Sequence, residues 1–104
     1  MTLTDKTIII SGASRGIGRA TALLLAQNGA NIIATARSAD DLNALAAEHP
    51  GVVAVPGDVA NEADMATVVQ TALDRFGRID VVINNAGYGI FKNVEDISPA
   101  NGTT

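Results

Sequence analysis

The apolar residues of this chain follow two patterns that alternate from one end to the other. Four short runs contain successive apolar residues with no regular polar alternation, and they predict buried strands at 7–10, 30–36, 52–55 and 79–83. Between these runs, apolar residues recur at helical spacing and predict three helices. Strand and helix alternate roughly every 25 residues, which is typical of parallel βαβ units with helices on both faces of a sheet. The pattern therefore predicts an α/β fold built on a four-stranded parallel sheet.

The three predicted helices differ in how clearly their buried faces are marked. The third runs from Asn61 to Gly77, and its apolar stripe comprises Met65, Val68, Val69, Ala72, Leu73 and Phe76. The second begins at Ser38, has Asp41 in capping-box position and ends at the 49–51 turn, with a stripe of Leu42, Leu45 and Ala46. The first ends at Asn28-Gly29 and is apolar on several sides. We assign its stripe to Ile17, Ala20, Leu24 and Leu25, with Leu23 and Ala26 on other faces.

A glycine-rich segment, SGASRGIG at 11–18, joins the first strand to the first helix. Gly12 permits a sharp turn after the strand, Gly16 lets the backbone approach a phosphate, and Gly18 lets the helix pack tightly against the sheet. The first N–H groups of that helix lack intrahelical partners, and together with the helix dipole they attract an anion. These features predict a pyrophosphate-binding turn. The alternative is a glycine-rich connection that binds no ligand.

The end of the second strand indicates which dinucleotide would bind. In dinucleotide-binding folds, an Asp or Glu about 20 residues beyond the glycines usually holds the ribose 2′-hydroxyl. Here the strand ends Thr35-Ala36-Arg37-Ser38, without a carboxylate. Arg37 can grip a 2′-phosphate that a carboxylate would repel, and Arg15 in the glycine turn could reach the same group. We therefore expect NADP(H) in preference to NAD(H), unless Arg37 is only a solvated loop cation.

Three motifs in order carry a resemblance to a known family. They are G-x-x-x-G-x-G at 12–18 after a hydroxyl residue, G-D-V at 57–59 and N-N-A-G at 84–87. The chain resembles the N-terminal half of the classical short-chain dehydrogenases/reductases from about residue 3 to residue 99. The resemblance implies a Rossmann-type sheet with strand order 3-2-1-4, truncated before the catalytic half, with the cofactor between strands 1 and 4. It leaves the apolar fourth strand, Val81–Ile83, without the fifth strand that flanks it in relatives.

The resemblance also implies a set of cofactor-binding residues. They are Gly12, Ser14, Arg15, Gly16, Ile17, Gly18, Arg37, Asp58, Val59, Asn85, Ala86 and Gly87. By resemblance, Asp58 meets the adenine amino group and the Val59 backbone bonds the ring, while Asn84 braces the sheet. The residues from Asn85 to Gly87 would lie against the ribose and nicotinamide. The alternative for Asp58 is a cap on the following helix.

The catalytic residues of the family, a serine and a Tyr-x-x-x-Lys pair on a later helix, are not assigned here. Tyr88–Lys92 spells Y-x-x-x-K, but it directly follows Gly87, contains Gly89, and is not preceded by the required strand, helix and serine. We expect hydride transfer between NADP(H) and a carbonyl or alcohol in a complete relative, and no catalysis by this chain alone. The alternatives are a stand-alone NADP-binding or sensing module and a non-functional truncated fragment.

Composition narrows the possibilities further. The chain has 104 residues, 47% of them hydrophobic, and a net charge of -4, with seven scattered Lys and Arg that argue against a nucleic-acid surface. It has no cysteine and one histidine, His49, so a multi-histidine metal site is excluded. The absence of a membrane-spanning run or secretory signal favours a cytoplasmic protein. We expect one domain at 1–97 and a flexible tail at 98–104, and we transfer no oligomeric state from the family.

Overall fold

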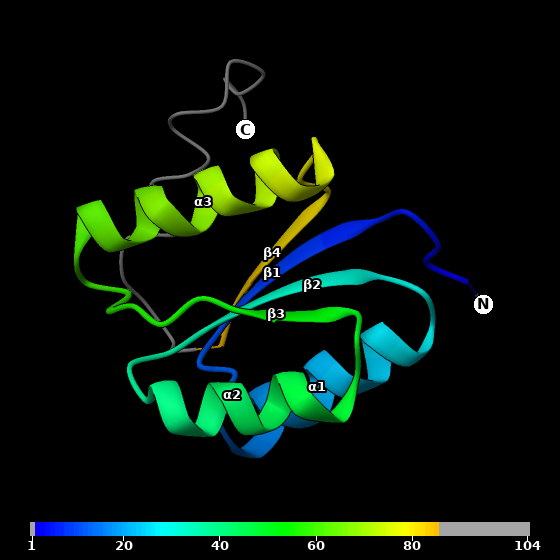
Figure 1. Ribbon diagram of the computed structural model, residues 1–104, viewed down its shortest axis with the longest axis horizontal. Helices are drawn as coiled ribbons and strands as arrows, with labels where there is room; N and C mark the ends of the chain where they lie inside the picture. Colours follow the sequence, from blue (N-terminus) through cyan, green and yellow to red (C-terminus); the bar gives the residue numbers. More distant parts are fainter. Residues whose placement is uncertain (1, 86–104) are drawn as a thin grey trace.

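The computed structural model describes residues 2–85, which form a parallel four-stranded sheet of order β3-β2-β1-β4 between two layers of helices (Figure 1). The α/β class and the strand order are therefore as predicted. Along the chain the elements are β1 (Thr7–Ser11), α1 (Gly16–Gln27), β2 (Asn31–Thr35), α2 (Ala39–Glu48), β3 (Val52–Ala54), α3 (Glu62–Phe76) and β4 (Val81–Asn84).

The sheet is centred on β1, which pairs in parallel with β2 on one side and with β4 on the other. Because side chains alternate across a strand, Ile8 and Ile10 face α1 and α2, whereas Ile9 faces α3. All three isoleucines are buried. Two core clusters result, one on each face of the sheet, and the strand that carries the glycine turn is held from both sides.

The predicted buried face of α1 was wrong. Ile17 and Leu24 are 77% and 58% exposed, while the buried residues of the helix are Gly18, Ala22 and Ala26. Small side chains at this i, i+4, i+8 spacing let the helix lie close to the sheet. A helix with apolar residues on several sides gives no sequence signal as to which side is buried. Here Ile17 and Leu24 face outward, while Leu23 and Leu25 are half-buried and pack against the core.

The other two helices agree with the sequence. Leu42 and Leu45 are buried in α2, and Met65, Val68 and Ala72 are buried in α3. Capping is also as expected: Ser38 and Asn61 accept backbone N–H groups, α2 ends before His49, and Gly77 closes α3 in a left-handed conformation with φ 75°. Within α3, Leu73 is the exception, since it is 42% exposed at the edge of the stripe.

Strand boundaries differ from the predicted runs for local reasons. Ala30 donates its N–H to Leu25 at the end of α1, so β2 begins one residue later. Asp80 lies before β4. Its carboxylate accepts hydrogen bonds from the N–H of Thr7 at 2.8 Å and from Nε and Nη2 of Arg78. These hydrogen bonds link the beginning of β1 to the segment that precedes β4.

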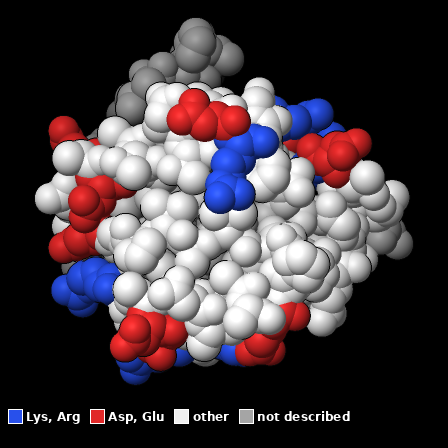
Figure 2. Space-filling view, viewed as in Figure 1, with Lys and Arg blue, Asp and Glu red and all other residues white. Residues whose placement is uncertain are grey.

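Within the described residues β4 is an edge strand, and Val81 is 44% exposed there, whereas Val82 and Ile83 are half-buried. No helix in the part described is long and apolar enough to cross a membrane. On the face shown in Figure 2, basic and acidic side chains lie near one another and do not line up in a basic stripe. The expected tail at 98–104 and the Tyr88–Lys92 segment lie outside the described residues.

Candidate functional site

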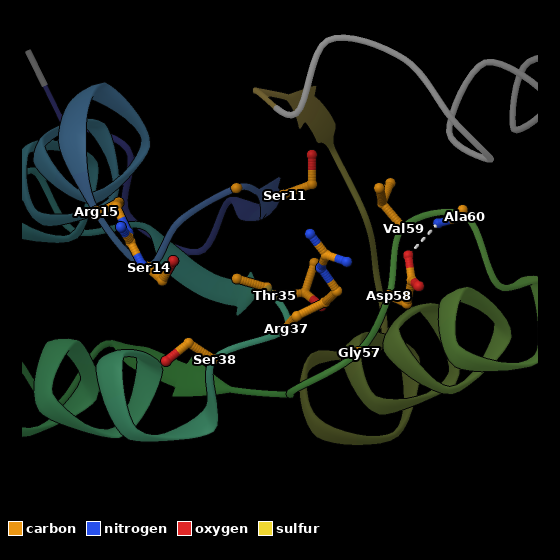
Figure 3. Close-up of a pocket in the computed structure, with 12 residues that line it drawn as sticks. Ser11, Ser14, Arg15, Thr35, Arg37, Ser38, Gly57, Asp58, Val59 and Ala60 are labelled. Atoms are coloured by element: carbon orange, nitrogen blue, oxygen red, sulfur yellow. Dashed lines mark hydrogen bonds between the residues drawn. The ribbon is translucent and has the colours of Figure 1, made fainter.

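A cavity of about 580 Å³ opens beyond the carboxyl ends of β1, β2 and β3 (Figure 3). Three connections form it, because parallel strands deliver their following loops to the same edge of the sheet. Its lining residues are Ser11, Gly12, Ser14, Arg15, Thr35, Ala36, Arg37, Ser38, Gly57, Asp58, Val59 and Ala60. One cavity is therefore shared by three segments that lie apart in the sequence: the glycine turn, the end of the second strand and the G-D-V motif.

The glycine turn needs its glycines for different reasons. Gly12 and Gly16 have φ values of 65° and 63°, in the left-handed region that side chains disfavour. Gly18 is required by contact: a Cβ there would overlap the carbonyl oxygen of Gly12 and lie 2.7 Å from Nδ2 of Asn85. The absence of a side chain at position 18 thus lets α1 start directly against the strand end.

The amino terminus of α1 differs from those of the other two helices. Its N-cap, Arg15, provides no side-chain cap, and its first turn carries no acidic residue. By contrast, Ser38 caps α2 and Asn61 caps α3, and both of those helices carry two acidic residues in the first turn. Uncapped N–H groups and the positive end of the helix dipole favour an anion at α1. The chain itself supplies the anion-like groups at α2 and α3 but not at α1.

Two arginines reach this cavity from different connections. Arg37 follows β2, is exposed, and has its side chain drawn among the cavity residues in Figure 3. Arg15 is 83% exposed, and its guanidinium lies 3.7 Å from the carboxylate of Asp41 in α2. The two arginines that the sequence analysis proposed for one phosphate therefore line the same cavity. An exposed ion pair of this kind holds Arg15 only weakly.

Asp58 does not cap α3, so that alternative is wrong: the N-cap is Asn61, whose side chain accepts the N–H of Asp64 at 2.9 Å. Oδ1 of Asp58 accepts the N–H of Ala60 at 2.9 Å (dashed in Figure 3), and its own N–H is donated to Oδ2 of Asp64. Within the described residues, Oδ2 of Asp58 accepts no hydrogen bond. One carboxylate oxygen at the cavity wall is thus left for a ligand donor.

Asn84 and Asn85, the described residues of the N-N-A-G motif, contact two residues that line the cavity, Ser11 and Gly12. The Ser11 hydroxyl donates to Oδ1 of Asn84 at 2.8 Å, which braces β1 against β4 as the resemblance implied. Nδ2 of Asn85 donates to the Gly12 carbonyl at 3.4 Å, a long contact that places Asn85 against the glycine turn.

The proposed site residues thus divide into three groups. Gly12, Ser14, Arg15, Arg37, Asp58 and Val59 line the cavity. Gly16, Ile17, Gly18 and Asn85 stand outside its lining, with Ile17 largely exposed. Ala86 and Gly87 lie outside the described residues.

The proposed cofactor-binding set left out several lining residues, among them Thr35, Ser38 and, although it begins the G-D-V motif, Gly57. Each is close in sequence to a residue that was named, which is the signal that could have found them. Thr35 is 1% exposed and its hydroxyl has no hydrogen-bond partner within the described part. Gly57 donates its N–H to Ala36 at 2.9 Å, which joins the second and third loops of the cavity.

Comparison with known proteins gives a consistent result. A family model described as short chain dehydrogenase matches residues 6–103. L-fucose dehydrogenase from Mus musculus is 41% identical over 83 residues, covering 80% of this chain and 30% of the relative. The 3-oxoacyl-[acyl-carrier-protein] reductase from Synechocystis is 43% identical over 90 residues, covering 82% of this chain and 36% of the relative.

Solved structures show the same likeness. A hydroxysteroid dehydrogenase from Escherichia coli superposes with a TM-score of 0.79 at 30% identity, covering 84% of this chain and 39% of the other. A 3-ketoacyl-(acyl-carrier-protein) reductase from Brucella melitensis, complexed with NADH, has a TM-score of 0.75 at 32% identity, covering 78% and 34% of the two chains. The chain therefore spans about a third of the length of the relatives it matches.

Proposed function

The chain belongs to the short-chain dehydrogenase family, and we propose that it forms the NADP(H)-binding part of an oxidoreductase of that family. One observation carries the proposal: the cavity at the strand ends combines an uncapped helix terminus with two arginines, Arg15 and Arg37. A dinucleotide with an extra phosphate is the ligand that needs both features, since the pyrophosphate suits the helix terminus and the 2′-phosphate suits the cations.

The preference for NADP(H) over NAD(H) rests on charge at the end of β2. A carboxylate at this place holds the ribose hydroxyls of NAD, whereas Arg37 stands here and no acidic residue lines the cavity on this connection. A similar reductase is complexed with NADH, so likeness to the family does not by itself select NADP(H), and we base the preference on the charge at this position.

The remaining proposed site residues are assigned to parts of the same ligand on the family resemblance. We assign the pyrophosphate to the turn from Gly12 to Gly18, the adenine to Asp58 and Val59, and the nicotinamide side to Asn85, Ala86 and Gly87. The unbonded Oδ2 of Asp58 supports the second assignment, because it can accept a hydrogen from an amino group at the cavity wall.

NADP(H) supplies or accepts the hydride in such an enzyme, and a carbonyl or alcohol is the proposed partner in the reaction. This chain contributes binding and orientation, and we propose no catalytic residue within it. The Tyr88–Lys92 segment follows the N-N-A-G motif directly and is not assigned to proton transfer. Turnover by the purified 104-residue chain that Tyr88→Phe abolished would contradict this assignment.

Calorimetric titration at low salt with NADP⁺ and NAD⁺ tests the proposal. We expect saturable binding of NADP⁺ and weaker binding of NAD⁺. Arg37→Ala should weaken NADP⁺ binding by about 10-fold or more, because a charge-assisted contact of about 1.5–3 kcal/mol is lost, and should leave NAD⁺ binding nearly unchanged. Arg75→Ala, which removes an exposed cation of α3 outside the cavity, is the control.

Two results would overturn the proposal. If neither nucleotide bound, the proposal that this chain is a cofactor-binding part would be refuted. Equal affinities for the two nucleotides, unaffected by Arg37→Ala, would leave a dinucleotide site but reject the role of the arginine.

A further inference from the structure

The first turn of α3 contains an unusual variant of a capping box. In the common arrangement the N-cap side chain accepts the N3 backbone N–H, and the N3 side chain accepts the N-cap N–H in return. Here Asn61 accepts the N–H of Asp64 at 2.9 Å, but the Asp64 carboxylate reaches past Asn61 to the N–H of Asp58. The Asn61 N–H is bonded instead to the carbonyl of Asp58 at 2.9 Å. The N3 carboxylate is therefore directed to the cavity wall.

The turn at 57–59 is held from two sides by these contacts. On one side, Gly57 donates to the carbonyl of Ala36, next to Arg37. On the other, Oδ2 of Asp64 holds the N–H of Asp58 at 2.9 Å, and a Cβ on Gly57 would lie only 3.2 Å from Cβ of Asp64. Asp64 is half-buried and does not line the cavity, so it acts on the turn and not on a ligand directly.

The Asp58 side chain depends on the orientation of its own backbone. The bond from the N–H of Ala60 to Oδ1 orients the Asp58 carboxylate, and the free Oδ2 can accept a hydrogen from a ligand. Loss of the Asp64 carboxylate would leave the Asp58 N–H without its partner, so that only the bond from the Asn61 N–H to the Asp58 carbonyl would tie this turn to the start of α3. The direction of Oδ2 would then be less tightly fixed.

We propose that Asp64 is a positioning residue for base recognition: by holding the Asp58 N–H, it aims the free Asp58 oxygen at an amino group on the purine of the nucleotide. This inference rests on the proposed function. It goes beyond it in assigning the selectivity for an amino-bearing base to a residue of α3 that touches no ligand.

A pair of ligands isolates this effect. Nicotinamide hypoxanthine dinucleotide phosphate differs from NADP⁺ in having an oxygen in place of the adenine amino group and a hydrogen on ring N1, and the new oxygen repels a carboxylate oxygen. We expect the unsubstituted chain to bind NADP⁺ about tenfold or more tightly than the hypoxanthine analogue. In Asp64→Ala this ratio should fall to about threefold or less, mainly through weaker binding of NADP⁺.

Two further variants separate positioning from stability. Glu62→Ala also removes one acidic residue from the first turn of α3 and should leave the ratio unchanged. Asp64→Asn keeps an oxygen that can accept the Asp58 N–H and should restore most of the preference. General destabilisation of the fold would weaken the binding of both nucleotides equally and would leave the ratio of their affinities unchanged.

Hydrogen exchange of the Asp58 amide, measured by NMR without nucleotide, distinguishes failure of this inference from failure of the proposed function. Faster exchange in Asp64→Ala but not in Glu62→Ala would support the tether. If the tether exists but the unsubstituted chain binds neither nucleotide, the proposed function fails and the positioning role falls with it. If the chain binds NADP⁺ and Asp64→Ala retains the full ratio, the inference alone is overturned.

Discussion

Replacing Gly18 by alanine should disrupt the junction between α1 and the glycine turn. The added Cβ would overlap the Gly12 carbonyl oxygen, and it would lie 2.9 Å from the Gly12 carbonyl carbon and 2.7 Å from Nδ2 of Asn85. Two of these three atoms belong to the backbone and cannot rotate away. The helix must therefore move outward from the strand end, together with the N–H groups that form the candidate phosphate site.

The expected cost follows from two opposing effects. Alanine inside a helix is favoured over glycine by about 1 kcal/mol. Overpacking against fixed atoms costs about 1–3 kcal/mol and occasionally more, and overlap with a backbone carbonyl belongs at the upper end of that range. We expect a net loss of about 2 kcal/mol in the free energy of unfolding. For a domain of this size, that loss corresponds to a decrease of about 8–16 °C in Tm.

Gly16→Ala is the matched control in the same turn. Gly16 has a left-handed φ of 63°, but its Cβ position has no neighbour within 4 Å. Gly16→Ala therefore introduces conformational strain but no steric overlap. The strain costs about 1–2 kcal/mol of stability, and the lower entropy of the unfolded chain partly offsets that cost. Urea unfolding followed by circular dichroism gives the free energy of unfolding for both variants and for the unsubstituted chain.

The reasoning would be refuted if Gly18→Ala were as stable as the unsubstituted chain, or lost less stability than Gly16→Ala. Either result would mean that α1 can shift away from the strand end at little cost. The close approach at Gly18 would then not hold the turn in place.

Two further predictions concern stability alone. The hydrogen bond from Arg78, and after it the one from the Thr7 N–H, lower the pKa of Asp80 below the ordinary 3.8. The ionised carboxylate therefore stabilises the folded chain above pH 3.8, and this contribution is lost as the pH falls through the pKa of the folded state. Asp80→Asn should therefore lower the urea midpoint at pH 7, and the deficit should shrink in acid; a deficit independent of pH would contradict this. Leu45→Ala should cost about 2–5 kcal/mol, whereas Leu24→Ala should cost less than about 1 kcal/mol. Comparable losses in urea unfolding would show that Leu24 is buried in solution, contrary to its 58% exposure.

Local chemistry explains why so much of the fold could be predicted. The β-branched run at Thr7–Ile10 favours a strand wherever it lies, and the stripe from Met65 to Ala72 has one apolar side that can only face a core. The caps at Ser38, Asn61 and Gly77 likewise act within a few residues of their own position.

The candidate site was predictable in its parts. Gly12, Arg37 and Asp58 each follow a predicted strand, and the parallel arrangement of strands brings such positions to one edge. Knowledge of the strand order, which came from a family resemblance, was needed to place them together. The role of Asp58 as a helix cap could not be rejected from sequence, because Asn61 was an equally suitable cap three residues later.

The sequence by itself determined the elements, their alternation and the chemical types at the strand ends, since these depend on periodicity and on neighbouring residues. Tertiary structure alone decided that α1 buries Gly18, Ala22 and Ala26. The helix lies so close to the sheet that this face takes small residues in place of larger apolar ones. It also decided that Asp64 bonds to Asp58, since the direction of that carboxylate depends on how the turn meets α3 in space.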